Sequence, residues 1–322
     1  MTIKNSVLEV ANLHVSFFTD QGELQVVQNV AFEINAGETV ALVGESGCGK
    51  SVTALAIMGL IEEPGRITQG NIKLKGQELV GLPQVELQHI RGHRIGMIFQ
   101  EPMTSLNPVF TIGHQIAEVL THHFKITERE AQPEVLNLLE KVGIPSPRRR
   151  IDQYPHELSG GMKQRVMIAM ALACKPDILI ADEPTTALDV TIQAQIMHLL
   201  KQLQDEMGMA ILLITHNLGV VAHFAQRVLV MYAGEIAEHS PVRPLFKNPL
   251  HPYTQALLNA LPKPGQKQIT AIQGTVPMPF EYPAGCRFST RCSASTKQCS
   301  QNIPLLREQE PQHQVACWLF RE

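Results

Sequence analysis

The segment GESGCGKS at 44–51 has residue types and a spacing that could bind a nucleotide phosphate. It follows the apolar run TVALVG at 39–44, which is typical of a buried parallel strand, and it opens a stretch of helical spacing at 51–60. Its glycines allow backbone N–H groups to converge on phosphate oxygens, and the helix start favours negative charge. The pattern predicts a phosphate loop in which Lys50 reaches the β- and γ-phosphates and Ser51 ligates Mg²⁺; its other members are Gly44, Glu45, Ser46, Gly47, Cys48 and Gly49.

A plainer interpretation of this segment is a glycine-rich turn that binds nothing. The strand before it and the helix after it make that interpretation unfavourable, because they are the context that a phosphate loop requires. Cys48 within the loop is interpreted as a small tolerated residue.

The segment ILIADE at 178–183 carries two neighbouring carboxylates at the end of an apolar run. The apolar residues predict a buried strand, from whose carboxyl end Asp182 would hold Mg²⁺ through water. Glu183 would then polarise the attacking water. The alternative is a solvated acidic pair at a strand end, which the upstream phosphate loop disfavours.

Gln100 and His216 each end a predicted strand, at RIGMIFQ (94–100) and in LLITHN. A single Gln or His at such a position is often only structural. However, the carboxyl ends of strands in open α/β sheets are where ligands bind. We therefore assign Gln100 to the metal and the attacking water, and His216 to the γ-phosphate.

Strands alternate with helical patterns along most of the chain, which predicts a mainly parallel sheet with helices on both faces. The first 40 or so residues are predicted to form short strands with turns. A helical insertion is predicted at about 101–177, with Pro133 near the start of a helix. Further strands are predicted at 177–182, 209–215 and 227–234, with helices at 190–207 and 218–225 between them.

The composition is that of an ordinary globular protein. The 322 residues are 44% hydrophobic and 18% charged, and the formal net charge of −3 gives no basic tail that would indicate nucleic acid. No apolar run approaches the roughly 20 residues that span a bilayer, and the first residues lack the apolar block of a leader peptide. We expect a cytoplasmic protein that reaches a membrane only through partners.

The sequence changes character after about residue 240. Prolines recur, and four of the 6 cysteines fall between 286 and 317. We predict a distinct extension over 241–322 that is irregular rather than sheet-like. Four thiolates within a loop-rich stretch indicate a bound metal that organises the fold, although four unrelated small residues are the alternative. Disulfides are disfavoured in a reducing cytoplasm.

The segment LSGGMKQR at 158–165, together with the two phosphate-site segments, resembles the nucleotide-binding domain of ABC (ATP-binding cassette) ATPases. The resemblance implies an ABC domain over 1–240 that has a P-loop, a mainly parallel sheet, an antiparallel β part and a helical subdomain. It also implies ATP hydrolysis at a head-to-tail dimer, where this segment faces the γ-phosphate of the partner's ATP. The residues so implied are Ser159, Gly160 and Gly161 of the segment, Asp189 as the link between the two sites, and Phe17 as the aromatic stacked on adenine.

Four further segments resemble the ATP-binding subunits of bacterial oligopeptide/dipeptide importers, which also serve nickel and glutathione. These segments are EPMTSLNP (101–108), YPHELSGG (154–161), EPTTALDVTIQAQI (183–196) and NPLHPYTQALL (248–258), and the tail pattern GCRF…RC…C…ACW agrees with them. The resemblance implies a second, different ATPase subunit, two membrane permeases and an extracytoplasmic solute-binding protein. It implies a place on the cytoplasmic face of the bacterial inner membrane, with a different small solute as the alternative cargo.

Relatives with this tail imply a 4Fe–4S cluster on Cys286, Cys292, Cys299 and Cys317, with zinc as the second choice. No CxxC pair is present, so the spacing is neither that of a zinc ribbon nor that of a ferredoxin. A non-transport ABC ATPase of DNA repair or translation is a further alternative. It is disfavoured because the chain has one compact cassette without a long insertion.

Overall fold

The computed structural model describes residues 6–100, 105–186, 188–261 and 272–320. Contacts divide the chain into two compact units. Unit 1 is made mainly of residues 81–213, and unit 2 is made of residues 8–34, 39–80 and 214–322. The first four residues of the EPMTSLNP segment and the residue at 187 lie outside the described residues.

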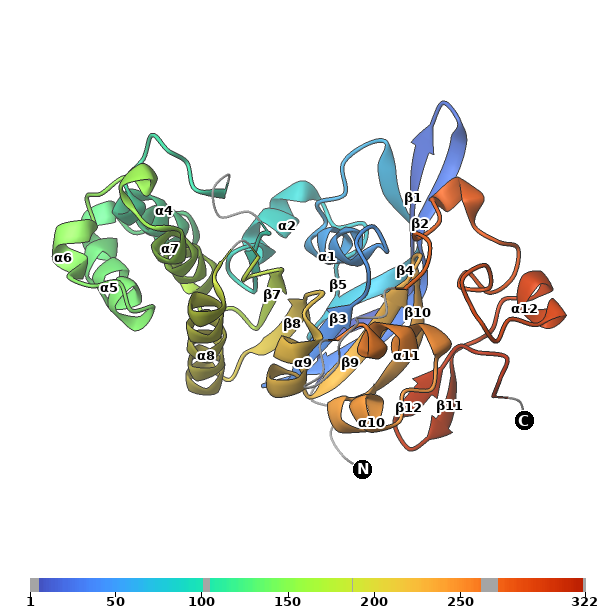
Figure 1. Ribbon diagram of the computed structural model, residues 1–322. Coiled ribbons are helices and arrows are strands. Elements are labelled where there is room, and N and C mark those ends of the chain that lie inside the picture. The colour runs from blue at the N-terminus through green and yellow to red at the C-terminus, as the bar shows by residue number, and fades with distance from the viewer. Residues whose placement is uncertain (1–5, 101–104, 187, 262–271, 321–322) are drawn as a thin grey trace. The chain divides into compact units, whose positions relative to one another are not determined.

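Unit 1 contains a small group of strands with helices around it (Figure 1). The strands β6 and β7 are parallel, with Ile95 opposite Ile178, and β8 neighbours β7. All five residues of β7 and of β8 are buried, which explains their continuous apolar runs. The elements of this unit are α2 (Gln84–Ile90), β6 (Ile95–Ile98), α4 (Ile112–Phe124), α5 (Glu128–Lys141), α6 (Pro147–Arg150), η1 (Pro155–Glu157), α7 (Gly160–Leu172), β7 (Ile178–Asp182), α8 (Val190–Met207) and β8 (Ala210–Ile214).

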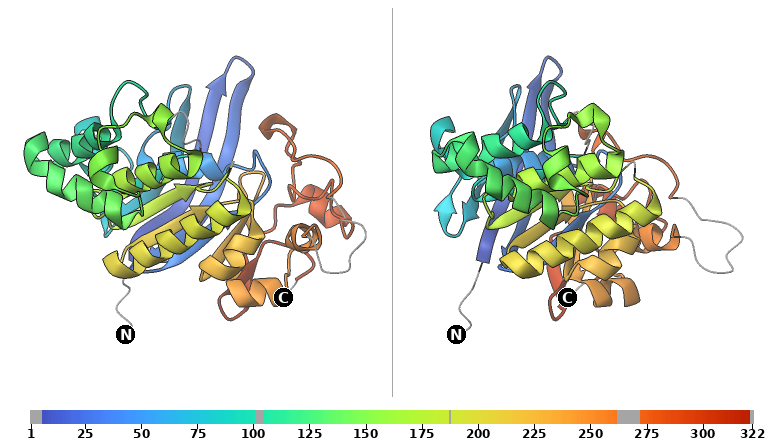
Figure 2. Two further views of the ribbon diagram at one scale, coloured as in Figure 1. Left: turned by 60° about the vertical axis from the view of Figure 1, so that its left-hand side comes forward. Right: turned by 90° about the vertical axis from the view of Figure 1, so that its left-hand side faces the viewer.

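The helices α4, α5 and α7 pack against one another, as both views of Figure 2 show. Their starts are fixed by local chemistry. Thr111 caps α4 by accepting a hydrogen bond from the His114 N–H, and Thr127 and Glu130 form a capping box at the start of α5. Pro133 lies inside α5 rather than near its start, in the second turn.

Unit 2 contains two groups of strands. The first is a sheet with the order β2-β1-β4-β5, in which β1 runs antiparallel to β4 with Leu8 opposite Leu74. In the second group β3 is parallel to β9, and β9, β10, β12 and β11 follow as antiparallel neighbours. The strands are β1 (Ser6–Thr19), β2 (Gly22–Asn35), β3 (Thr39–Val43), β4 (Gly65–Leu74), β5 (Gln77–Glu78), β9 (Arg227–Tyr232), β10 (Glu235–Pro241), β11 (Arg307–Glu310) and β12 (His313–Val315).

The expectation of short strands near the N-terminus is wrong, because β1 and β2 have 14 residues each. Alternation of polar and apolar residues is typical of a strand with one buried face, and pairing of β1 with β2 on one side and β4 on the other extends the strands beyond the short lengths expected. The helices of this unit are α1 (Lys50–Met58), α9 (Leu218–Phe224), α10 (Val242–Lys247), α11 (Pro252–Asn259), η2 (Pro279–Glu281) and α12 (Lys297–Gln301).

The extension after residue 240 is more regular than expected. Its strand β12 pairs with β10, with Glu238 opposite Val315, and β11 pairs with β12 in turn. The extension also shares a hydrophobic core with the strands of the cassette, because Tyr253 and Phe288 pack in one cluster with Val43 and Val230. The prolines do not mark loops throughout, because Pro244 lies within α10 and Pro252 is the first residue of α11. The pairing of β12 depends on a buried partner strand far away in the sequence.

His251 predicts a pH-dependent contribution to stability. Burial lowers the pKa of His251 to about 4, and its Nδ1 accepts a hydrogen bond from the Tyr253 N–H at the start of α11. The unfolded chain therefore binds a proton as the pH falls below 6.5, while the folded chain does not. The contribution of His251 to the free energy of unfolding is complete above pH 6.5 and is lost as the pH falls toward 4. At pH 5 this contribution has fallen by about 2 kcal/mol.

Urea unfolding at pH 7 and pH 5 checks this expectation. His251→Asn is the matched variant, since asparagine can still cap α11 but does not titrate. The variant should lose less stability between the two pH values than the native protein. An equal loss in both proteins would show that other groups carry the pH dependence.

Candidate nucleotide site

The loop after β3 leads into α1, as the sequence predicted for a phosphate loop. Gly47 and Gly49 have φ values of +79° and +105°, and Gly49 is the residue before the first turn of α1. A Cβ on Gly44 would lie 2.2 Å from the Met231 carbonyl oxygen of β9. Glycine is therefore required at 44 for space, and the loop passes directly over β9.

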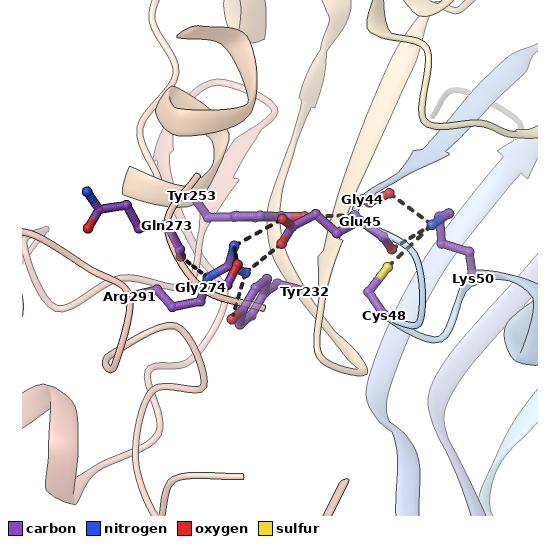
Figure 3. A network of polar contacts seen from close by, with 9 residues as sticks. All are labelled: Gly44, Glu45, Cys48, Lys50, Tyr232, Tyr253, Gln273, Gly274 and Arg291. Carbon is purple, nitrogen blue, oxygen red and sulfur yellow. Dashed lines mark hydrogen bonds and ion pairs between the residues drawn. The ribbon is translucent and has the colours of Figure 1, made fainter. Parts of the chain in front are cut away.

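Lys50 is buried at the first position of α1 (Figure 3). Its Nζ donates hydrogen bonds of 2.9 Å to the carbonyl oxygens of Gly44 and Glu45, and it lies 3.6 Å from the Cys48 Sγ. These contacts hold the ammonium group against the loop. Burial raises the pKa of the Cys48 thiol, although Lys50 opposes this, so the thiol stays protonated as a small buried group.

Glu183 directly follows β7 and its backbone has a φ of +47°, an uncommon value for a residue with a side chain. Its Oε2 accepts hydrogen bonds from the Gln100 Nε2 at 3.2 Å and from the Thr186 Oγ1 at 2.7 Å. The preceding Asp182 is buried at the end of β7. The carboxylate of Glu183 is thus oriented by two donors, which suits a group that accepts a proton from water.

The residues Ser159, Gly160 and Gly161 form the start of α7. The Ser159 Oγ accepts from the Met162 N–H at 3.4 Å, and Ser159 and Gly160 are exposed. A Cβ on Gly161 would lie 3.1 Å from the Ile192 side chain of α8, so the starts of α7 and α8 are neighbours. Asp189 caps α8 by accepting from the Ile192 N–H at 2.9 Å. This helix start presents exposed backbone at which a phosphate could bind.

Phe17 and His216 lie in unit 2 with the phosphate loop, whereas Gln100, Asp182, Glu183, the α7 start and Asp189 lie in unit 1. The Phe17 ring packs against Gly65 of the paired strand β4. The neighbouring Phe18 is exposed, with the Arg66 guanidinium 4.1 Å from its ring centre. His216 is exposed and follows Thr215, whose N–H donates to the Leu42 carbonyl of β3 at 3.3 Å.

Comparison with known proteins decides the family. Residues 27–186 match the family described as ABC transporter, and residues 237–299 match the oligopeptide/dipeptide transporter C-terminal region. The dipeptide transport ATP-binding protein DppD of Bacillus subtilis (strain 168) is 51% identical over 316 residues, which cover 97% of this chain and 94% of DppD. The oligopeptide transport ATP-binding protein AppD of the same strain is 49% identical over 321 residues, covering 99% and 98% of the two chains. The chain belongs to the ABC transporter family.

Solved structures of ABC cassettes agree with this family and fold. The dimeric post-hydrolysis state of the ATP-binding cassette MJ0796 bound to ADP and Pi superposes with a TM-score of 0.66 at 30% identity. It covers 73% of this chain and 99% of that cassette. The predicted P-loop ABC fold is therefore confirmed, and the ABC subunit described here is an ATP-hydrolysing ATPase that uses ATP and Mg²⁺.

The loop of this ABC subunit fits those ligands. Its glycines have positive φ values and carry no Cβ atoms, and Lys50 and Ser51 stand at the start of α1. Bound Mg²⁺ would supply charge neutralisation at the β- and γ-phosphates. No helix among the described residues combines the length and the apolar character needed to cross a bilayer.

The predicted metal centre of the extension is not formed as expected. In the described part of the chain, no three His, Cys, Asp or Glu side chains are arranged to hold a metal. Cys286, Cys292, Cys299 and Cys317 are nevertheless free thiols that lie near one another. Burial, with a smaller effect of the other three thiols, raises the pKa of Cys286 to about 12. The four cysteines that cluster in the sequence thus also lie near one another in the structure, but their thiols are not arranged as a set of metal ligands.

Two groups of contacts at the ABC site were not predicted. Thr186 binds Glu183, and Arg291 of the extension binds Glu45 of the phosphate loop. The spacing of Thr186 three residues after Glu183 could have indicated a local side-chain bond. Arg291 stands directly before Cys292 in the GCRF…RC pattern, and that pattern carries no signal for a contact with Glu45.

Proposed function

We propose that this ABC subunit hydrolyses ATP to power the uptake of dipeptides and oligopeptides. The observation that carries this proposal is the match of residues 237–299 to the oligopeptide/dipeptide transporter C-terminal region, in a chain about half identical to DppD over nearly its whole length. The nucleotide site supports turnover, because Glu183 is oriented by two hydrogen-bond donors at the end of β7. Nickel, glutathione or another small solute is the alternative cargo.

The proposed machine is a head-to-tail pair of ATPase subunits, of which the second is a different chain. Ser159, Gly160 and Gly161 of one subunit would face the γ-phosphate held by the partner, and Asp189 would link the two sites. Gln100 and His216 would sense the metal, the water and the γ-phosphate, and Phe17 would stack on adenine. The exposed start of α7 supports this arrangement. Val190, the residue after Asp189, supports it as well, because its apolar side chain is 82% exposed.

The pair would sit beneath two permeases on the cytoplasmic face of a bacterial inner membrane, and an extracytoplasmic binding protein would deliver the solute. ATP favours the closed pair through its higher affinity for that state, and hydrolysis allows it to reopen. This motion would give the permeases alternating access to the two sides of the membrane.

Affinity purification of the full chain from detergent-solubilised membranes tests this function. We expect two polytopic permeases and a second ATPase subunit to copurify, and the binding protein to take up peptides in equilibrium dialysis. A binding protein that takes nickel or glutathione instead would change the cargo. Recovery from the soluble fraction alone, with repair or ribosomal proteins, would refute the transport function.

We also propose that Cys286, Cys292, Cys299 and Cys317 hold an iron–sulfur cluster once their loops adjust around it. The proximity of the four free thiols supports this, and their present arrangement does not yet supply the ligand set. Anaerobically purified protein should contain about four irons per chain and be visibly coloured, and Cys292→Ser should lower both the iron content and the colour. Zinc in place of iron would identify the alternative metal, whereas protein free of both would refute a metal centre.

A further inference from the structure

The C-terminal extension contacts the phosphate loop through the side chain of Arg291 (Figure 3). Arg291 Nη1 lies 2.6 Å from Glu45 Oε2, and Nη2 lies 3.0 Å from Glu45 Oε1. This is the two-pronged geometry in which a guanidinium group binds a carboxylate most specifically. The pair joins residues 246 positions apart, one in the extension and one at the second position of GESGCGKS.

Arg291 is itself held in place on several sides. Its Nε donates to the Gln273 carbonyl oxygen at 2.8 Å, and its Nη2 also donates to the Gly274 carbonyl oxygen at 3.1 Å. Its Nη1 lies 3.3 Å from the hydroxyl of Tyr232 on β9. The Arg291 side chain is only 5% exposed and the Glu45 side chain is 26% exposed, so the ion pair is partly shielded from water.

Every polar group of Glu45 has a partner in this network. The carboxylate binds Arg291, and the backbone N–H donates to the Tyr253 hydroxyl at 2.9 Å. The backbone carbonyl accepts from the Lys50 Nζ at 2.9 Å. The Cys48 N–H also donates to this carbonyl oxygen, at 3.4 Å. Two of the four partners belong to the extension, and another is Lys50, the lysine assigned to the nucleotide phosphates.

These contacts form a chain that leads from the extension through Glu45 to Lys50. Tyr253 is fully buried in α11 and its ring packs on Tyr232 and Phe288, so its hydroxyl has a fixed position. Arg291 and Tyr253 together determine where the Glu45 peptide lies. The Glu45 carbonyl in turn accepts from Lys50, whose ammonium group is also bound by the Gly44 carbonyl, so a shift of the Glu45 peptide would move one of the two carbonyl acceptors of Lys50.

We propose that Arg291 is a positioning residue for ATP binding, through which the extension holds the phosphate loop in its binding conformation. The inference rests on the ATP-binding part of the proposed function and not on the cargo. It assigns to the arginine of the tail pattern a role in the reaction, separate from any role of the cysteines.

Equilibrium binding of Mg-ATP to the purified full chain tests the proposal. Arg291→Ala should raise the Kd for Mg-ATP about tenfold, and Arg291→Lys, which keeps the charge but loses the two-pronged geometry, about threefold. Arg243→Ala is the matched control, since it removes one exposed cation of the same extension on α10, and it should stay within twofold. Turnover at saturating ATP should fall less than the affinity, because Glu183 is untouched.

Glu45→Gln distinguishes positioning from simple charge. Through-space electrostatics alone would make this variant bind the anionic nucleotide more tightly, whereas loss of positioning makes it bind more weakly, by about threefold to tenfold. The double variant with Arg291→Ala should be no weaker than Arg291→Ala alone, because both remove one interaction. Additive effects, or tighter binding by Glu45→Gln, would refute the proposal.

The outcomes remain decisive if a variant folds poorly. Melting temperatures without nucleotide show which variants are folded, and Glu45→Gln leaves the extension intact should Arg291→Ala fail. Unchanged ATP binding by a folded Arg291→Ala refutes the inference while leaving ATP-driven uptake standing. Failure to recover permeases would refute the transport function while leaving this inference standing.

Discussion

Replacement of Glu183 by glutamine is expected to lower ATP turnover by a factor of about 100 to 10,000 while ATP still binds. The amide keeps the size of the side chain and can still accept from Thr186 and Gln100, but it cannot take a proton from the attacking water. Bound ATP should therefore remain intact and hold the ATPase pair closed. Phosphate release and retention of radiolabelled ATP on the complex measure the two effects.

Glu206→Gln is a suitable control for this experiment. Glu206 is an exposed carboxylate on α8 that pairs with Lys141 at 3.7 Å, so its loss changes the same charge in the same unit. The ATP turnover of the Glu206→Gln variant should stay within about twofold of the native value. Undiminished hydrolysis by Glu183→Gln would remove Glu183 from the reaction and leave another group as the base.

Replacement of Gly44 by alanine is expected to abolish measurable ATP binding and to destabilise the fold by about 3 kcal/mol. The new Cβ would lie 2.2 Å from the Met231 carbonyl oxygen and 2.7 Å from the Cys48 Sγ. The first of these is backbone within β9, so either the loop or the strand must shift. Isothermal titration with Mg-ATP and urea unfolding measure the two losses.

Gly76→Ala separates this collision from the general cost of replacing a glycine. Gly76 also has a positive φ, +82°, but a Cβ there would meet no atom within 4 Å. Its alanine variant should lose only about 1 kcal/mol and bind ATP normally. If both variants behaved alike, the collision with β9 would not explain the effect at Gly44.

Local sequence patterns predicted most of the elements that position the nucleotide site. The helix over 190–207 was predicted with the bounds that the structure has, because its apolar spacing is regular and it begins beside an Asp cap. The strand before Glu183 was predicted to end at Asp182, as it does, whereas the strand predicted to end at Gln100 ends at Ile98. The structure nevertheless joins the Gln100 and Glu183 side chains by a hydrogen bond.

Contacts between distant segments could not be predicted in the same way. Nothing local to Arg291 specifies Glu45 as its partner, since the pair depends on how α11 and the following loops pack on β9. The same reason explains the pairing of β12 with β10, whose short strands carry little signal of their own. The cysteine ligands were inferred from their clustering in the sequence and from a family resemblance, and neither determines how the thiols converge.

The core that unites Tyr253 and Phe288 with Val43 and Val230 has a consequence for how such a chain can evolve. Substitutions on either side of residue 240 constrain one another, because a larger residue in β9 needs a smaller one in the extension. An extension acquired by recombination from another transporter would bring core side chains that do not fit those of β3 and β9. Inheritance should therefore favour transfer of the gene as one piece over exchange of its parts.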